Sequence, residues 1–217
     1  MYQGLEVKVI SLDVAGTLVS DSFIDYFWLE LIPQLFAERH GVTLEESKRF
    51  VYSSYDKIGR NDLRWYLPSF WFKSFDLNLS VSEALNSIRD KVEVYSDVRK
   101  ALVKLSSKRD LVISSNLSKD FIDVALEAIG FRNFKAIFSC VTDLGLIGKT
   151  PEFYTFILKR LGVPPRAVLH VGDDPIKDYE NPIRVGMKAI LIKRSGNATY
   201  PYVRDLMELL NILDTSP

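Results

Sequence analysis

The sequence has little cysteine, no net charge and no long apolar run. Cys140 is the only cysteine among 217 residues, so an internal disulfide framework is excluded. The 28 basic and 28 acidic side chains cancel, which argues against a field that attracts nucleic acid or an anionic membrane. The apolar runs are far shorter than a membrane span. Since no signal-like leader is evident, we expect a cytoplasmic protein that contacts neither nucleic acid nor membrane.

Short apolar runs predict the strands of a parallel sheet. They occupy residues 7–12, 111–114, 167–171 and 188–192. Helical patterns lie between or after them, at residues 97–105, 119–129, 152–161 and 203–213. Strands that alternate with helices of this length are typical of a sheet covered by helices on both faces. We therefore expect a doubly wound α/β fold.

Residues 20–93 interrupt this alternation. They contain no convincing strand, and two capping-box patterns mark helix starts there, Thr43 with Glu46 and Ser80 with Glu83. The stretch therefore reads as helices in series.

The domain organisation follows from this insert. Pro33 and Pro68 should kink or split helices of the insert. We expect an α/β core of residues 1–19 and 94–217, with residues 20–93 as a helical cap over the carboxyl ends of the strands.

Polar residues gather where the expected strands end, which is where open α/β sheets bind their ligands. The first group is the turn Asp13 to Thr17, with the sequence DVAGT. The others are Ser115 with Asn116, then Lys149, then Asp173 and Asp174 followed by Asp178. We expect these groups to form one site.

These residue types suit phosphoryl transfer. A carboxylate such as Asp13 can attack phosphorus and form an acyl-phosphate, which divides one difficult step into two easier ones. Because phosphate is anionic, the attack needs cations, and an acidic oxygen cluster suits Mg²⁺. Lys149 adds a positive charge, and hydroxyl groups such as those of Thr17 and Ser115 can donate hydrogen bonds to phosphate oxygens.

In order and chemistry, the four groups resemble the four motifs of the haloacid dehalogenase superfamily. After the first motif come LVISSN, GKTPEFYTFILKRLGVPP and HVGDDPIKDYENPIRVGM, and VYSDVRKALVKL resembles the phrase that precedes the second motif. The resemblance covers nearly the whole chain. It implies a C1-type helical cap and a Mg²⁺-dependent hydrolase, most simply a phosphatase that acts on a small phosphorylated metabolite as a monomer or homodimer.

The resemblance also assigns roles to residues. Asp13 becomes the nucleophile, helped by Thr17, Ser115 and Lys149, and Asn116, Ala15 and Gly16 lie at the substrate. The expected metal ligands are Asp13, the backbone carbonyl of Ala15, Asp173, Asp174 and Asp178. Either Asp174 or Asp178 can instead cap the helix that follows.

Ala15 departs from the usual pattern, because most family members have a second aspartate there. That aspartate is a general acid and base, a role that typically contributes ~10²- to 10⁴-fold. The phosphonatase branch also has the pattern Asp-x-Ala-Gly-Thr, and it uses a cap lysine to form a Schiff base. Lys48, Lys57 and Lys73 lie in the expected cap, but no local sequence singles one out.

Three alternatives therefore stay open beside the phosphatase. One is carbon-phosphorus hydrolysis of the phosphonatase type. Another is 2-haloacid dehalogenation, for which Arg39 is the candidate cap arginine, although that branch needs no metal and GDDPIKD is acidic. The third is a catalytically weakened relative that binds a ligand or a protein.

Other residues have plainer interpretations. His170 lies inside an expected strand and Cys140 in an apolar run, so both are expected to be buried. The aromatic stretch 63–75 either packs within the cap or lines an apolar pocket; the candidates for the pocket are Trp65, Tyr66, Phe70 and Trp71.

Overall fold

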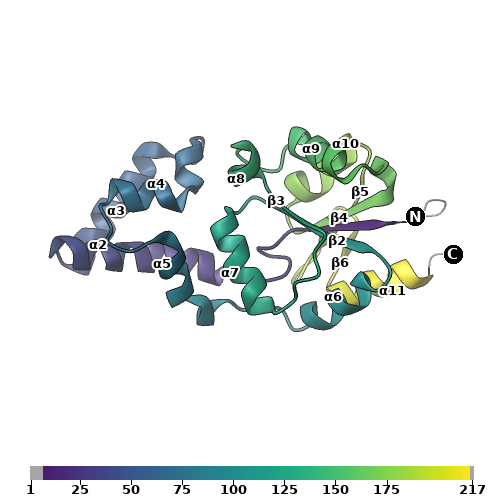
Figure 1. Cartoon of the computed structure of the whole chain (residues 1–217), viewed down its shortest axis with the longest axis horizontal. Coiled ribbons are helices and arrows are strands. Elements are labelled where there is room, and N and C mark those ends of the chain that lie inside the picture. The colour runs from purple at the N-terminus through teal and green to yellow at the C-terminus, as the bar shows by residue number, and fades with distance from the viewer. Residues whose placement is uncertain (1–6, 216–217) are drawn as a thin grey trace.

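The fold is built on one parallel β-sheet of six strands. In the computed structural model, which describes residues 7–215, the strand order is β3-β2-β1-β4-β5-β6, and every pair is parallel (Figure 1). The strands are β1 (Val9–Leu12), β2 (Asp110–Ser115), β3 (Ala136–Ser139), β4 (Val168–Gly172), β5 (Lys188–Ile192) and β6 (Tyr202–Val203).

The four predicted strands are confirmed as β1, β2, β4 and β5. Two strands were missed. β3 lies in the apolar run that contains Cys140, and β6 has two residues and falls where a helix was expected to begin. The predicted helix 203–213 is wrong at its start, because Val203 is in β6 and α11 begins at Leu206.

Helices cover both faces of the sheet (Figure 1). On one face lie α6 (Val98–Ser106), α7 (Lys119–Ile129) and α11 (Leu206–Thr215), and on the other α8 (Cys140–Leu144), α9 (Pro151–Leu161) and α10 (Asn181–Arg184). Alternate residues of β1 pack on opposite faces of the sheet. Ile10 and Leu12 belong to the buried cluster that includes side chains of α6, α7 and α11, whereas Val9 belongs to the one that includes side chains of α8 and α9.

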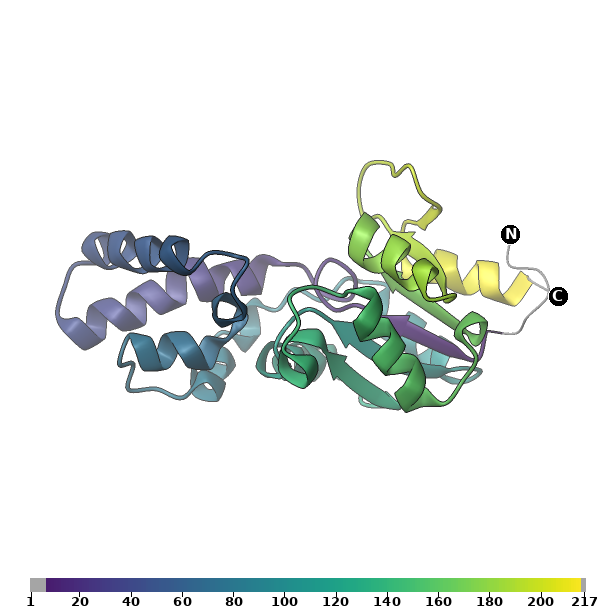
Figure 2. The same cartoon turned by 90° about the horizontal axis from the view of Figure 1, so that it is seen from above.

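A helical insertion follows β1. It contains α1 (Ser22–Tyr26), a π-helical segment (Phe27–Leu31), α2 (Ile32–His40), α3 (Leu44–Ile58), α4 (Pro68–Ser74), α5 (Val81–Ser87) and two 3₁₀ turns (Leu63–Tyr66 and Arg89–Lys91). Figure 2 shows this insertion extending to one side of the α/β core. The core adds a 3₁₀ turn (Pro165–Ala167) and a π-helical segment (Pro175–Glu180).

The chain passes between the core and the insertion at two adjacent points. Val19 and Val94 form an antiparallel bridge, and the backbone N–H of Ser20 donates to the carbonyl of Glu93 at 2.9 Å. The outgoing and returning segments are therefore hydrogen-bonded to each other.

Both predicted capping boxes are present, at the starts of α3 and α5. Pro68 begins α4 and separates it from the preceding 3₁₀ turn, as predicted. Pro33 follows the π-helical segment in a helix that continues from Ser22 to His40. Its effect is therefore a change of helix type and not a break.

Two tyrosines of α3 satisfy carbonyls that this irregularity frees. Ile32 N–H donates to the carbonyl of Phe27, and Pro33 has no N–H, so neither residue donates to Trp28. The Tyr55 hydroxyl donates to the carbonyl of Trp28 at 3.1 Å. The Tyr52 hydroxyl likewise donates to the carbonyl of Leu29 at 2.7 Å. These bonds tie α3 to the first helix of the insertion.

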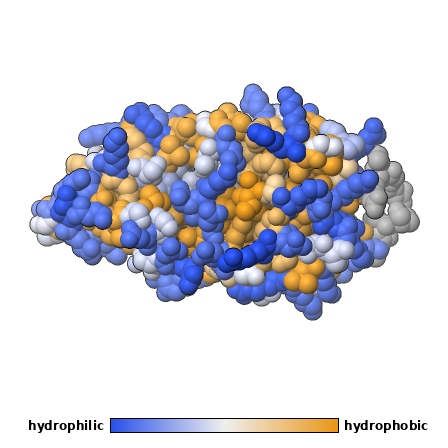
Figure 3. Space-filling view, in the orientation of Figure 1, coloured by the Kyte–Doolittle hydropathy of each residue, from blue (hydrophilic) through white to orange (hydrophobic). Residues whose placement is uncertain are grey.

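Hydrophilic side chains are spread over both the core and the insertion on the face in Figure 3, with smaller hydrophobic areas between them. Exposed large apolar side chains such as Phe50, Val103 and Ile176 come from separate elements. Within residues 7–215, no helix has the length and apolar character that a membrane span requires.

We expect Tyr55→Phe to lower the free energy of unfolding by about 1 kcal/mol, because the Trp28 carbonyl would lose its donor in a half-buried position. Tyr52→Phe is the matched control. Its bond is exposed, so water can replace the hydroxyl and the loss should be smaller. Urea unfolding followed by circular dichroism measures both, and a larger loss for Tyr52→Phe would contradict this account.

Candidate active site

The first polar turn begins directly after β1. The backbone N–H of Asp13 donates to the carbonyl of Val171 at 2.9 Å, which extends the sheet by one bond. The carbonyl of Val14 then accepts from Leu18 at 2.8 Å and from Val19 at 3.1 Å, so the chain folds tightly back on itself. This leaves Asp13 at the carboxyl edge of the sheet, with 6% of the residue's surface exposed.

Gly16 allows this turn to approach the fourth polar group. Its φ is +70°, which favours glycine, and a Cβ there would lie 2.6 Å from Cγ of Asp173. Gly172 has a similar steric role, since a Cβ on it would lie 2.3 Å from Cγ of Asp178. Only hydrogen fits at these two positions, which lets Asp173 approach the turn after β1 and Asp178 approach the end of β4.

Lys149 lies between two buried carboxylates. Its Nζ is 2.5 Å from Oδ2 of Asp13 and 2.5 Å from Oδ1 of Asp178. Burial lowers the pKa of Lys149, but the two carboxylates outweigh that effect and raise it above the ordinary value. Burial likewise opposes ionisation of Asp178, yet Lys149 and His170 hold its pKa below the ordinary value. Lys149 and Asp178 are therefore both charged at neutral pH.

Asp173 completes a cluster of three carboxylates. One oxygen each from Asp13, Asp173 and Asp178 lies within 4.8 Å of the others. Burial, followed by the charges of Asp13 and Asp178, raises the pKa of Asp173 to about 7.

The donor set fits a divalent cation. Carboxylate oxygens are the ligands that Mg²⁺ prefers, and a dication would favour ionised Asp173. Oδ1 of Asp13 is buried and has no hydrogen-bond partner in residues 7–215, so it is available to a ligand.

The structure gives different positions to Asp174 and Asp178, each of which the sequence had offered as a metal ligand or a helix cap. Asp174 caps the next helical segment, because its Oδ1 accepts from the N–H groups of Ile176 and Lys177 at 3.0 and 2.8 Å. Its Oδ2 pairs with Nζ of Lys177 at 3.0 Å. It lies outside the carboxylate cluster, whereas Asp178 lies within it. The geometry therefore places Asp178, and not Asp174, beside Asp13 and Asp173.

The second polar group divides into two roles. Ser115 ends β2 and borders the same cavity as Asp13. Asn116 also borders the cavity, but its Oδ1 accepts from the N–H of Gly148 at 2.9 Å and from Sγ of Cys140 at 3.1 Å. The side chain of Asn116 therefore positions the loop that carries Lys149.

Asn181, which the sequence did not single out, holds Lys149 from the other side. Its Nδ2 donates to the Lys149 carbonyl at 2.8 Å. Thr17 is fully buried, and its Oγ1 has no partner among the described residues. Thr17 does not border the cavity, so the structure does not place its hydroxyl with that of Ser115.

A buried polar chain behind the cluster was also missed. His170 is buried, as expected, but its Nε2 lies 2.8 Å from Oδ1 of Asp178 and 3.0 Å from the Tyr154 hydroxyl. Its Nδ1 lies 2.8 Å from Oγ of Ser11, which donates to Ser114 at 2.7 Å. The signal in the sequence was the polar residues inside otherwise apolar strands.

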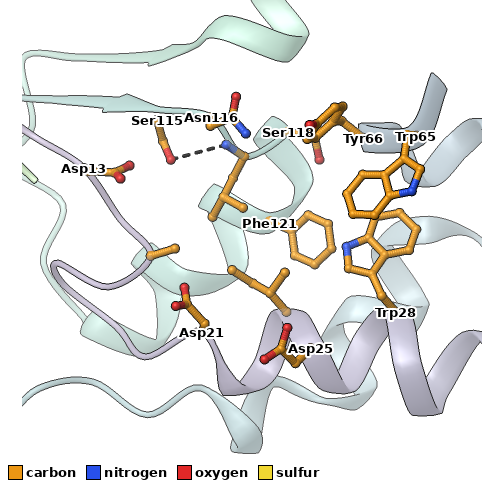
Figure 4. A pocket seen from close by; sticks show the side chains of 13 residues that line it. Asp13, Asp21, Asp25, Trp28, Trp65, Tyr66, Ser115, Asn116, Ser118 and Phe121 are labelled. Carbon is orange, nitrogen blue, oxygen red and sulfur yellow. Dashed lines mark hydrogen bonds between the residues drawn. The ribbon is translucent and has the colours of Figure 1, made fainter. Parts of the chain in front are cut away.

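The site opens into a cavity of about 340 Å³ between the sheet edge and the insertion (Figure 4). Trp28 and Trp65 form an aromatic wall, with ring centroids 6.3 Å apart and planes inclined by 29°. Phe121 packs against Trp28 at 5.9 Å. The lining is Asp13, Ala15, Asp21, Ile24, Asp25, Trp28, Trp65, Tyr66, Ser115, Asn116, Leu117, Ser118 and Phe121.

Of the four aromatic candidates in the insertion, Trp65 and Tyr66 line this cavity. Phe70 and Trp71 do not. Trp71 is 2% exposed and packs against Tyr55 at a centroid distance of 4.7 Å. Both interpretations of the aromatic stretch therefore apply, each to different residues.

The other expected cap residues lie away from the cavity. None of the three cap lysines lines it, and Lys48 instead pairs with both carboxylate oxygens of Glu30 at 2.7 Å. Arg39 pairs with Asp76. Burial, the largest effect, raises the pKa of the Cys140 thiol to about 12, which agrees with an inert buried side chain.

Comparison with known proteins agrees with this geometry. The model of the haloacid dehalogenase-like hydrolase family matches residues 7–181. The chain therefore belongs to the haloacid dehalogenase-like hydrolases, which confirms the resemblance at the level of the superfamily.

Individual relatives are more distant. The chain is 26% identical to the GMP/IMP nucleotidase YrfG of Escherichia coli over 169 residues, which are 77% of this chain and 75% of that protein. It superposes on a haloacid dehalogenase-type phosphatase from Thermococcus onnurineus with a TM-score of 0.80 and 26% identity, covering 96% and 99% of the two chains.

A third similarity shows the shared fold. The hydrolase YfnB of Bacillus subtilis, solved bound to magnesium, matches with a TM-score of 0.63 and 19% identity over 97% of this chain and 100% of that one.

The raised pKa of Asp173 predicts how the metal-free protein responds to pH. Between its ordinary value of 3.8 and about 7, the native state retains a proton that the unfolded state has released, so stability falls as pH rises. Asp173→Asn removes that decline. In EDTA the variant should be more stable than the parent protein at about pH 8 and nearly equal at about pH 4, as urea midpoints would show.

Asp174→Ala is the matched control, because it removes a helix cap and should lower stability by about 1 kcal/mol. Equal losses of stability for both variants at about pH 8 would contradict the argument that ionised Asp173 destabilises the metal-free native state.

Proposed function

We propose that the chain is a Mg²⁺-dependent phosphatase that hydrolyses small phosphate monoesters through an aspartyl-phosphate on Asp13. The observation that carries the proposal is Oδ1 of Asp13, which is buried, unpartnered and at the cavity edge beside a lysine and two further carboxylates. Membership of a hydrolase family and the similarity to a nucleotidase and a phosphatase support it.

The residues present account for the first chemical step. A carboxylate oxygen of Asp13 attacks phosphorus, and Lys149 orients that carboxylate through its Oδ2. The Ser115 hydroxyl, at the end of β2, is available to donate to a phosphate oxygen. Asn116 and Asn181 hold the Lys149 loop, so that the positive charge stays fixed while negative charge moves toward the leaving oxygen.

Asp13, Asp173 and Asp178 would hold the metal ion, and we keep the backbone carbonyl of Ala15 as a proposed additional ligand. When bound, Mg²⁺ would neutralise charge on the phosphoryl group and reduce its repulsion from the carboxylates. YfnB, which shares the fold, was solved with magnesium.

The insertion serves, in this proposal, as a cap that selects the substrate and excludes water. We propose residues 20–93 as this cap and residues 1–19 and 94–217 as the core. The hydrogen-bonded crossings at Val19 and Ser20 would be the hinge between them.

Nucleoside monophosphates are the substrates that we propose first. The relative YrfG is a GMP/IMP nucleotidase. The aromatic wall of Trp28 and Trp65, with Phe121 beside it, offers ring faces for a planar base. Base stacking on an aromatic side chain contributes ~1–3 kcal/mol. The cavity volume is at the lower end of the range typical of small-molecule sites.

The geometry favours phosphate esters over the two other reactions. A Schiff-base phosphonatase needs a cap lysine at the substrate, and none of the three candidates lines the cavity. A dehalogenase of the metal-free type needs a cap arginine there, and Arg39 is paired elsewhere. A weakened binding protein remains the alternative outside catalysis, and a turnover measurement separates it from the phosphatase.

Asp13→Asn should lower phosphatase turnover by ~10³-fold or more, because an amide cannot form the acyl-phosphate. Release of inorganic phosphate from GMP and from p-nitrophenyl phosphate, with Mg²⁺ and with EDTA, measures it. Asp110→Asn is the control, since Asp110 begins β2 at the opposite edge of the sheet and pairs with Lys135. Unchanged turnover in Asp13→Asn would disprove the proposed reaction.

Trp65→Ala should raise the KM for GMP by ~10- to 100-fold, which corresponds to the loss of one stacking partner. Its kcat/KM for ribose 5-phosphate should change little, because that substrate has no aromatic ring to stack. Phe70→Ala is the control, since Phe70 lies on α4 outside the cavity. Equal effects of Trp65→Ala on both substrates would contradict base stacking.

A further inference from the structure

The site lacks an evident proton carrier for the leaving group. Lys149 is committed to two carboxylates, Asp13 is the proposed nucleophile, and Ala15 has no functional group. Departure of the leaving group as an unprotonated alkoxide makes the first step much slower, and a base is also needed to activate the water of the second step. The residues that line the cavity therefore have to include a replacement.

Four lining residues are titratable: Asp13, Asp21, Asp25 and Tyr66. The Tyr66 hydroxyl already donates to the carbonyl of Arg60 at 3.1 Å. The carboxylates of Asp21 and Asp25 have no hydrogen-bond or ion-pair partner within residues 7–215. Because they are four residues apart, at the start of one helix, they share a helix face.

The backbone brings Asp21, more directly than Asp25, to the position of Ala15. The tight turn after Asp13 folds Val19 alongside Ala15, and the two residues form a parallel bridge. Asp21 is two residues beyond Val19, which limits the separation of their Cα atoms to roughly 7 Å. Asp21 and Ala15 both line the cavity, so a carboxylate at position 21 and a longer side chain at position 15 would face the same space.

The surroundings of Asp21 favour a carboxyl group that can hold a proton. Burial first, then the charges of Asp25 and Asp13, raise the pKa of Asp21. Figure 4 shows Asp21 on the side of the cavity nearest the Asp13 strand, with Asp25 farther along the helix toward Trp28. The two aspartates thus line different parts of the cavity wall.

We propose that Asp21 is a catalytic residue, namely the general acid and base that replaces the missing carboxylate at Ala15. The inference rests on the proposed phosphatase reaction. It also makes the crossing between the core and the insertion a part of the active site.

The proton balance is as follows. As a carboxylate oxygen of Asp13 bonds to phosphorus, the ester bond breaks, its electron pair stays on the leaving oxygen, and that oxygen takes the proton of Asp21. The products are an alcohol, an aspartyl-phosphate and ionised Asp21. Water then attacks phosphorus and gives a proton to Asp21, the bond to Asp13 breaks, and phosphate leaves with both aspartates restored.

The test compares Asp21→Asn with Asp25→Asn on two substrates. Ribose 5-phosphate has a poor alkoxide leaving group, whereas p-nitrophenolate leaves without a proton. For Asp21→Asn we expect kcat on ribose 5-phosphate to fall by ~10²- to 10⁴-fold. On p-nitrophenyl phosphate we expect a fast burst of about one equivalent of nitrophenolate, then slow turnover, because only the hydrolysis of the intermediate still needs the base. Asp25→Asn leaves the Asp21 carboxyl group in place, so it should lose much less kcat on ribose 5-phosphate than Asp21→Asn.

The double variant Ala15→Asp with Asp21→Asn provides a rescue. If Asp21 carries the proton, a carboxylate at position 15 should recover most of the lost kcat on ribose 5-phosphate. A structural role for Asp21 would give no rescue and no burst, and either result would overturn the inference. So would equal losses in Asp21→Asn and Asp25→Asn.

Failure of the proposed function itself looks different. In that case the parent protein releases no phosphate from any ester, and Asp13→Asn changes nothing. Active parent protein with unaffected Asp21→Asn would instead leave the phosphatase in place and remove only the role of Asp21. Urea midpoints would show whether the variants are folded, and we expect them to be, because the Asp21 carboxylate has no partner within residues 7–215.

Discussion

The site depends on one buried cation between two buried anions. Lys149 pairs with both Asp13 and Asp178, and without it three carboxylates would face one another where water is largely excluded. Removing one member of such a buried ion pair usually costs several kcal/mol, so the loop that carries Lys149 has to be held firmly. Asn116 and Asn181 do this through its backbone, and His170 supports Asp178 from inside the sheet.

The same short turn connects this electrostatic centre to the insertion. It places Asp13 at the sheet edge, brings Gly16 against Asp173, and returns Val19 to the side of Ala15. Any movement of the insertion about its two adjacent crossings would therefore act on the wall of the cavity that lies next to the nucleophile. A proton carrier on this segment would couple closure of the cap to chemistry.

The aromatic residues of the insertion have two roles, which depend on their position. Trp71 and Tyr55 stabilise the helices against each other, whereas Trp28 and Trp65 present their rings to the cavity. The π-helical segment before Pro33 includes Trp28, and the carbonyl of Trp28 accepts a hydrogen bond from the Tyr55 hydroxyl. An irregular helix thus provides both a ligand-facing ring and a bond that ties the insertion together.

The sequence by itself determined the parallel α/β class, the helical insertion and the motif order, because strand periodicity, helix caps and the spacing of polar groups are local properties. It also pointed to the acidic cluster at the strand ends. Only the tertiary structure decided that Asp178 joins the cluster while Asp174 caps a helix, and that Trp28, Phe121 and Asp21 line the cavity. Those facts depend on backbone folds that bring distant residues together, which no local pattern encodes. For the same reason β3 and β6 escaped prediction: each is short, and its strand character comes from the neighbour with which it pairs.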